Sequence, residues 1–261
     1  MEVPRLELYE NKYSHFKFER RDGIMQVTMH SDNKDLVWGA VPDEEMGYML
    51  EDIGRDAENK VIILTGSGDT FIHHEDLGGG FDKIPAEIWP GIVSYAKRLL
   101  NAHLDIDAPM IAAINGPATI HAELGLLCDI VLASDTAVLA DQPHYPNGLV
   151  PGDGVQVIWP MLIGMNRARH MLFTGRHLTP QESLDLGLVA EVLPNADLLP
   201  RAWELAHKLL EAPPTTLRLT RTVFTSQIKK QLNEHLGYGL ALEGLAAAEY
   251  WPGEFKAGDM P

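Results

Sequence analysis

Residues 59–71 read Asn59-Lys-Val-Ile-Ile-Leu-Thr-Gly-Ser-Gly-Asp-Thr-Phe71 and give the first indication of the architecture. The aliphatic, β-branched run shows no polar alternation, which is typical of a strand buried on both faces. The turn Gly66-Ser-Gly68 ends this run. It begins like a dinucleotide-binding fingerprint but lacks the third glycine, so we interpret it as a tight turn after a strand.

Segments on both sides of this strand alternate between strand and helix signals. The first two strands flank Arg20-Arg-Asp-Gly23, a turn-prone stretch that predicts a hairpin. The predicted strands are 16–18, 23–29, 60–65, 109–114 and 129–133, and the predicted helices are 43–56, 88–104, 120–127, 198–210, 215–232 and 235–250. This alternation predicts an α/β fold. Because no low-complexity linker interrupts the chain, we expect one α/β core, residues 1–195, followed by a helical C-terminal part, residues 196–261.

The composition restricts the class of partner. The chain has 261 residues, and its 21 Lys and Arg against 37 Asp and Glu give a formal net charge of −16. Nucleic acid and anionic membrane surfaces both require basic patches, so this acidity argues against either as the main partner. The hydrophobic share of 45% and the charged share of 22% are ordinary for a globular protein with a substantial core.

Cysteine usage and the N-terminus bear on the compartment. Cys128 is the only cysteine, so no internal disulfide is possible and a reducing compartment is expected. It lies in an apolar, strand-like run, which favours a buried structural role over that of a nucleophile. The N-terminal residues lack the basic and apolar regions of a signal peptide, and no apolar run reaches the ~18 residues of a membrane span. We expect a cytoplasmic protein without membrane association.

Several common catalytic signatures are absent from the sequence. There is no G-x-S-x-G nucleophile elbow and no P-loop lysine after a glycine-rich turn. The run His73-His74-Glu75-Asp76 lacks the H-x-x-x-H or H-E-x-x-H spacing that places zinc ligands on one face. We therefore expect neither a metal nor an organic cofactor.

The loop Asp141-Gln-Pro-His-Tyr-Pro-Asn-Gly-Leu-Val-Pro-Gly-Asp-Gly154 carries the strongest functional signal. It places His144 and Asp153 on opposite arms of a Pro- and Gly-rich turn, where the two side chains could meet as a catalytic dyad. A histidine oriented by a carboxylate can activate water near neutral pH. Loops held by a rigid scaffold often carry such chemistry.

Three other residues are candidates on weaker, separate grounds. His121 stands at the start of a predicted helix after a buried strand, where unpaired N–H groups suit a developing oxyanion. Trp38 carries an indole N–H that can only donate a hydrogen bond, so it could hold a carbonyl oxygen. Glu243 is a lone carboxyl on an apolar helix, where desolvation favours a partner or a wet cleft. A structural role remains open for each of the three.

Taken together, several stretches resemble the crotonase (enoyl-CoA hydratase/isomerase) superfamily over nearly the whole chain. The stretches are 59–71, Pro109-Met-Ile-Ala-Ala-Ile-Asn-Gly-Pro117, Asp129-Ile-Val-Leu-Ala-Ser134, Leu149-Val-Pro-Gly-Asp-Gly154, Leu172-Phe-Thr-Gly175 and Ala190-Glu-Val192. The resemblance implies a core of repeated ββα turns arranged as a spiral over residues 1–195. It also implies a helical trimerisation region over 196–261, with assembly as a homotrimer or a dimer of trimers.

The departures from the superfamily pattern are informative. The first oxyanion-hole loop usually resembles F-x-A-G-A-D-L but here reads Phe71-Ile-His-His-Glu-Asp-Leu77, and Ile120-His-Ala122 replaces the usual run of glycines. The catalytic glutamates of the hydratases are absent from their usual places. These departures resemble those of a small branch, 6-oxocamphor hydrolase and the cyanobacterial β-diketone hydrolases. Its pattern carries over onto five residues of this chain: Trp38, His121, His144, Asp153 and Glu243.

This resemblance implies hydrolysis of a C–C bond in a 1,3-diketone, with water activated by His144 and Asp153 and the second carbonyl held by Trp38 and His121. The camphor enzyme has a further histidine where this chain has Pro42, which favours simpler diketones. Two alternatives remain: an acyl-CoA hydratase, isomerase or thioesterase of the same fold, and a non-catalytic scaffold or RNA-binding protein. The altered oxyanion loops count against the first, and the negative charge counts against the second.

Overall fold

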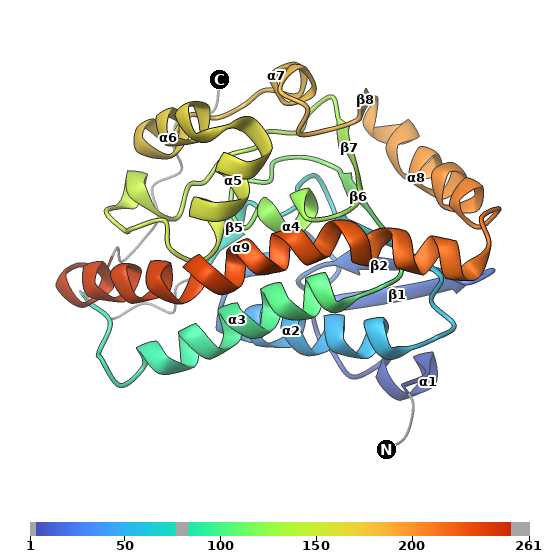
Figure 1. The fold of residues 1–261 in the computed structure, drawn as a ribbon, viewed down its shortest axis with the longest axis horizontal. Coiled ribbons are helices and arrows are strands. Elements are labelled where there is room, and N and C mark those ends of the chain that lie inside the picture. The colour runs from blue at the N-terminus through green and yellow to red at the C-terminus, as the bar shows by residue number, and fades with distance from the viewer. Residues whose placement is uncertain (1–3, 77–82, 252–261) are drawn as a thin grey trace.

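The computed structural model describes residues 4–76 and 83–251. Its strands are β1 (Phe16–Arg21), β2 (Ile24–Met29), β3 (Val37–Trp38), β4 (Val61–Gly66), β5 (His74–Glu75), β6 (Met110–Ile114), β7 (Ile130–Ser134) and β8 (Glu191–Leu193). Its helices are α1 (Leu6–Tyr9), α2 (Ala40–Arg55), α3 (Trp89–Asp105), α4 (Glu123–Leu126), α5 (Val155–Ile163), α6 (Met165–Thr174), α7 (Pro180–Asp185), α8 (Asn195–Leu209) and α9 (Pro214–Glu249), with a 3-10 turn at Tyr145–Asn147. The chain is therefore an α/β protein, as predicted (Figure 1).

A six-stranded sheet forms the centre, with the strand order β1-β2-β4-β6-β7-β8. The predicted hairpin joins β1 and β2, which are antiparallel and connected by Asp22-Gly23. Both turn residues have positive φ, 54° and 83°, which is the backbone that matches a two-residue hairpin to the strand twist. The remaining pairs are parallel, and β3 and β5 form a separate parallel pair.

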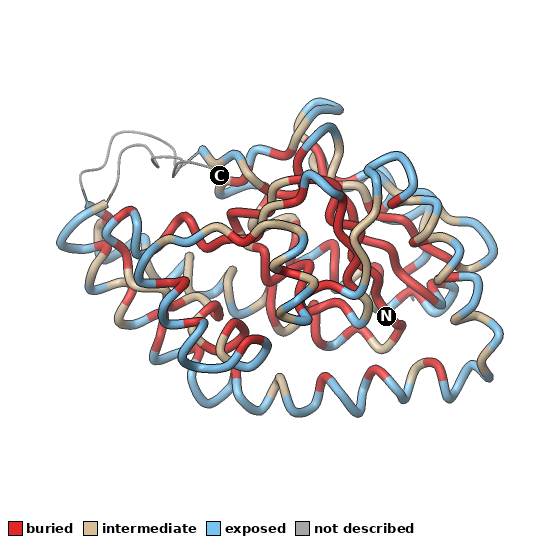
Figure 2. Tube along the Cα trace, turned by 90° about the horizontal axis from the view of Figure 1, so that it is seen from above, coloured by how far each residue is buried: buried red, intermediate tan, exposed pale blue. Residues whose placement is uncertain are grey.

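Both faces of the sheet are buried, which explains the unbroken apolar runs in the sequence. On one face, Ile24, Ile63 and Ile111 pack with α8 through Leu198 and Ala202. On the other face, the alternate strand residues join the main core together with α2 and α3. Figure 2 shows the buried interior and the exposed outer sides of the peripheral helices. In the described part of the chain, no helix combines the length and apolarity needed to span a bilayer.

The C-terminal part differs from the sequence expectation in the continuity of its last helix. The predicted helices 215–232 and 235–250 form one continuous helix, α9, because no proline separates them and Leu232, Leu236 and Leu240 continue a single buried face. Helix α8 packs directly on the central sheet. The long helix α9 then crosses the molecule beside α3 (Figure 1).

Candidate active site

A cavity of about 880 Å³ lies between the β3–β5 pair, the helices α2, α3 and α9, and the loop that follows β7. Trp38, His121, His144, Asp153 and Glu243 all line it, although they come from five separate segments of the chain. Apolar side chains form much of the remaining wall: Ile84, Ile88, Ile92, Leu99, Leu100, Leu149, Leu240 and Trp251. The fold thus gathers all five candidate residues around one space large enough for a small organic molecule.

His144 is held by a carboxylate on its own loop. The 3-10 turn that follows it brings His144 Nδ1 within 2.6 Å of Asp141 Oδ1, and both side chains are buried. Asn147 closes the turn by donating a hydrogen bond from Nδ2 to the backbone oxygen of Gln142 at 2.7 Å. Because Nδ1 is taken by Asp141, the second nitrogen, Nε2, is the one available for proton transfer.

This geometry revises the expected orientation of the dyad. Asp153 does not contact Nδ1; its Oδ1 lies 3.5 Å from Nε2 of His144, on the opposite edge of the ring. Glu243 approaches the same nitrogen, with Oε1 at 3.9 Å. The orienting partner is Asp141, which the sequence analysis did not single out. Its spacing of three residues from His144 brings the two side chains together across the turn.

Two buried carboxyl oxygens of the residues around Nε2 of His144 lack a hydrogen-bond partner among the described residues: Asp153 Oδ1, which lies 3.5 Å from that nitrogen, and Oε2 of Glu243, whose other oxygen is the one near the ring. Buried polar atoms in folded proteins almost always have a partner, either protein or water. Two acceptors beside an imidazole nitrogen are therefore suited to hold a water molecule. The arrangement can present that water to His144 for deprotonation.

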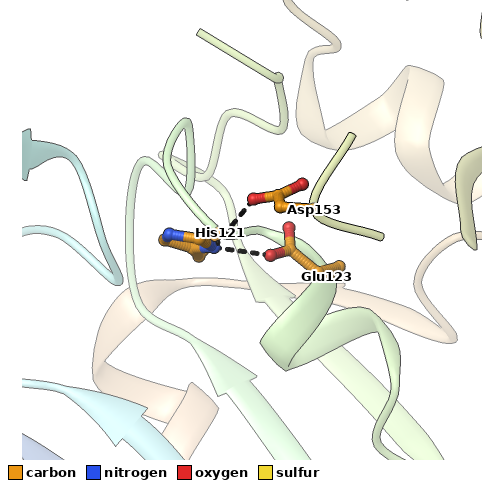
Figure 3. A group of neighbouring side chains, drawn as sticks. All are labelled: His121, Glu123 and Asp153. Carbon is orange, nitrogen blue, oxygen red and sulfur yellow. Dashed lines mark hydrogen bonds and ion pairs between the residues drawn. The ribbon is translucent and has the colours of Figure 1, made fainter. Parts of the chain in front are cut away.

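His121 occupies a strained position between β6 and α4. Its backbone φ is +46°, a left-handed value that a non-glycine residue seldom adopts and that is often found at functional sites. Its Nδ1 lies 2.7 Å from Glu123 Oε1 and 3.7 Å from Asp153 Oδ2. Both carboxylates face the same nitrogen, so the other nitrogen of the ring points away from them (Figure 3).

Trp38 packs against this histidine. The two ring centroids are 4.5 Å apart, with an angle of 46° between the ring planes. Asp153 in turn lies between the two histidines, with Oδ2 toward His121 and Oδ1 toward His144. The candidate residues thus form one connected polar group on the cavity wall.

The carboxylates decide the charge of both histidines. Burial lowers the pKa of His144, but Asp141 and Asp153 raise it more, so the pKa lies well above its ordinary value. For His121, burial again lowers the pKa, while Glu123 and Asp153 raise it to about 10. His121 is therefore a cation at neutral pH.

Besides the candidate Glu243, further carboxyl groups border the cavity, and the sequence analysis gave these no role. Burial raises the pKa of Glu243 to about 8, that of Glu75 to about 7 and that of Asp43 to about 6. Glu123 contacts His121 from within α4 and is buried. Glu75 stands inside the altered stretch 71–77, and that departure from the superfamily pattern was the only sequence signal for it.

The run His73-His74 does not form a ligand set. His73 Nδ1 lies 2.8 Å from Thr119 Oγ1, whereas His74 is exposed and its Nε2 lies 3.6 Å from Asp35 Oδ2. A group with metal-ligand spacing is instead formed by His121, Glu123 and Asp153, whose ligand atoms lie within 4.8 Å of one another. The hydrogen-bonded ion pair of His121 with Glu123 accounts for this closeness.

Cys128 lies outside this group. Its thiol is buried, and burial raises its pKa to about 12. A thiol that stays protonated is a poor nucleophile, in agreement with the structural role predicted for it.

Comparisons with known proteins agree with this architecture. The sequence model for enoyl-CoA hydratase/isomerase matches residues 19–243. A carnitinyl-CoA dehydratase from Citrobacter koseri is 29% identical, with 93% of this chain and 90% of that protein covered. Among solved structures, a β-diketone hydrolase from the cyanobacterium Anabaena sp. PCC 7120, bound to (S)-3-oxocyclohexyl acetic acid, is similar with a TM-score of 0.90 and 42% identity, covering 92% of this chain and 97% of that chain. The predicted fold is thereby confirmed, and the chain belongs to the enoyl-CoA hydratase/isomerase (crotonase) family.

Proposed function

We propose that this protein is a β-diketone hydrolase that cleaves the C–C bond between the two carbonyls of a 1,3-diketone. The observation that carries the proposal is the presence, in one cavity, of two histidines whose rings are held by different carboxylates. His144 presents a single nitrogen beside the unpartnered Oδ1 of Asp153, and His121 is a half-buried cation packed on Trp38. The likeness at 42% identity to a β-diketone hydrolase supports it.

The reaction begins with water held near Nε2 of His144. His144 takes a proton from this water while Asp141 holds the ring and stabilises the imidazolium that forms. The hydroxide oxygen bonds to one carbonyl carbon and gives a tetrahedral intermediate. Asp153 and Glu243 orient the water, because both side chains approach this nitrogen and each has an oxygen without a partner among the described residues.

Collapse of the intermediate breaks the bond to the carbon between the carbonyls. The electron pair of that bond moves into an enolate whose charge resides on the second carbonyl oxygen. The Trp38 N–H and the His121 cation stabilise this oxygen, and a single such donor typically contributes about 10²–10³ in rate. The proton on His144 then returns to the enolate carbon. A cyclic diketone gives a keto acid, and an open-chain diketone gives a ketone and a carboxylic acid.

The charge of the cavity favours a neutral substrate. Six carboxyl groups border the two histidines: Asp43, Glu75, Glu123, Asp141, Asp153 and Glu243. A neutral diketone enters such a site without adding a further charge. A CoA thioester would bring phosphate groups toward a chain with a net charge of −16. The apolar wall of the cavity suits the hydrocarbon part of a diketone.

The decisive experiment is incubation with a bicyclic 1,3-diketone that carries two alkyl groups on the carbon between its carbonyls. Such a substrate cannot enolise at that carbon, so its cleavage requires hydrolytic C–C chemistry. We expect a keto acid heavier than the substrate by one water, formed by the wild type and not by His144→Ala. A panel of acyl-CoA thioesters serves as the comparison. Turnover of thioesters without diketone cleavage would contradict the proposal and favour an acyl-CoA activity.

A further inference from the structure

Glu75 stands beside the residues proposed to hold the second carbonyl. It is the last residue of β5, and the parallel pairing of β5 with β3 places it directly opposite Trp38. Register partners on neighbouring strands project their side chains to the same side. Glu75 is therefore the neighbour of Trp38, whose indole packs on His121, and all three residues line the cavity.

The Glu75 side chain has an unsatisfied oxygen. Its Oε2 is buried and has no hydrogen-bond partner among residues 4–76 and 83–251. A buried polar atom without a partner is costly, and in a cavity the missing partner is commonly a water or a ligand group. The oxygen thus marks a point where a polar atom of the substrate can bind.

The charged groups around Glu75 favour its neutral form. Asp43 approaches from α2 and Asp153 from the loop after β7, while His121 and His144 contribute the opposing positive charge. Burial is the largest effect and raises the pKa of Glu75 to about 7, with Asp153 and Asp43 acting in the same direction. A carboxylic acid can donate a hydrogen bond, whereas a carboxylate can only accept one.

We propose that Glu75 is a further catalytic residue, which in its neutral form donates a hydrogen bond from its O–H group to the second carbonyl oxygen of the diketone. This role rests on the proposed function. The bond strengthens as that oxygen becomes an enolate, so Glu75 stabilises the transition state more than the bound substrate. A protonated carboxyl in an apolar site is a known device for holding an enolate. Together with Trp38 and His121, it gives this oxygen three donors.

The test compares Glu75→Gln with Glu75→Ala in the diketone assay over a range of pH. Glutamine keeps a neutral donor, so Glu75→Gln should retain most of the turnover number. Alanine removes the donor, and we expect kcat to fall about 10²–10³-fold with little change in KM. Thermal unfolding followed by circular dichroism checks that both variants fold. If the alanine variant does not fold, the pH profile of Glu75→Gln still tests whether Glu75 acts as a hydrogen-bond donor.

The pH profile separates a donor from a merely structural residue. In the wild type, kcat requires a neutral His144 and a protonated Glu75, so the loss of the Glu75 proton should add an alkaline decline to the rise that His144 sets. In Glu75→Gln this decline should disappear, and only the loss of the His121 proton near about 10 should remain. Asp43→Asn is the matched control, since it removes a carboxyl from the same cavity. Because Asp43 raises the pKa of Glu75, this variant should keep the decline and move it to lower pH.

Two outcomes would overturn the role of Glu75 alone: an unchanged alkaline decline in Glu75→Gln, or wild-type kcat in Glu75→Ala. In both cases the wild type still cleaves the diketone, so the proposed function stands. Absence of diketone cleavage by the wild type would instead remove the proposed function and the role of Glu75 with it.

Discussion

His144 meets two carboxylates with its two ring nitrogens, and the two contacts differ in kind. At Nδ1 the Asp141 oxygen lies at hydrogen-bond distance, 2.6 Å, whereas at Nε2 the Asp153 oxygen lies at 3.5 Å. The first contact fixes the tautomer, because Nδ1–H donates to Asp141 and leaves the lone pair on Nε2. The second leaves room for a water molecule to approach. Asp141 and Asp153 therefore have separate tasks in the proposed mechanism.

We predict that Asp141→Asn lowers kcat by about 10³-fold or more, because an amide can donate to Nδ1 and stabilise the tautomer that cannot act as a base. The pH dependence gives a second readout. The base must be neutral, so kcat/KM rises with pH through the pKa of His144, which Asp141 holds well above its ordinary value. Removing that charge should move the rise to lower pH. Measuring kcat/KM against pH for the wild type and for Asp141→Asn checks whether the rise moves to lower pH.

Asp153→Asn is the informative comparison for this prediction. It should also reduce turnover, but through loss of the water contact rather than through the tautomer. Wild-type turnover in Asp141→Asn, together with inactivity of Asp153→Asn, would contradict our assignment. Asp153 would then be the orienting residue expected from the sequence.

At this scale the sequence indicated which residues meet, but not which atoms. The five candidates Trp38, His121, His144, Asp153 and Glu243 line one cavity. The partner of Nδ1 depends on the backbone angles of the turn at 145–148, which no residue pattern specifies. The positive φ of His121 was equally invisible, since histidine gives no conformational signal of the kind that glycine gives.

At the scale of elements, α9 places Glu243 by a close approach to the loop that carries Asp153. Gly152 and Gly239 meet at this crossing, where a Cβ on Gly239 would lie 2.3 Å from the backbone oxygen of Gly152 and 2.1 Å from Gln156 Nε2. Neither distance is tolerated without movement of the loop or the helix. The two glycines are therefore required by packing, although one of them lies in the middle of a helix.

We predict opposite effects for two alanine substitutions on α9. Gly239→Ala should destabilise the protein by about 1–3 kcal/mol through overpacking, and should reduce turnover because Glu243 and Asp153 move apart. Gly237→Ala is the matched control, two residues away on the same helix. Its Cβ would meet only Lys97 Nζ, at 3.7 Å. It should stabilise the protein by up to about 1 kcal/mol through helix propensity. Equal unfolding midpoints of the two variants in urea would contradict the packing argument.

The sequence predicted the buried parallel strands of the central sheet better than the helix boundaries, but it missed β3, β5 and β8. The apolar, β-branched runs at 60–65 and 109–114 have to be buried, and they form the strands β4 and β6. The β1–β2 hairpin was predicted from the turn that ends in Asp22-Gly23. In the structure these two residues have the positive φ values that the turn requires. The continuity of α9 was missed because apolar residues also lie on its exposed side, so no single face stands out and the periodicity is weak; these residues are Leu219, Val223, Phe224, Tyr238 and Leu245. Packing on α3 and α5 holds this helix together.

At the scale of the whole molecule, the described part of the C-terminal region, residues 196–251, packs against the core. Helix α8 completes one face of the central sheet, and α9 contributes Glu243 to the cavity. The boundary at residue 195 stays a prediction from the sequence pattern. The same helix α9 exposes a group of apolar side chains near its start: Leu219, Val223 and Phe224 are 56%, 62% and 64% exposed.

We propose that this apolar group contributes to an interface between copies of the chain, as the family resemblance implies for a trimer or a dimer of trimers. Light scattering coupled to size exclusion should then give three or six times the chain mass of 28.9 kDa. Phe224→Asp should lower this mass, because a buried unpaired charge opposes association. Gln231→Asp places the same charge at an exposed polar position of α9 and should leave the assembly unchanged.

A monomeric wild type would contradict the proposal, and the exposed apolar group would then have no role in assembly. Because the described site residues all come from one chain, the dissociated variant should retain diketone cleavage if it stays folded.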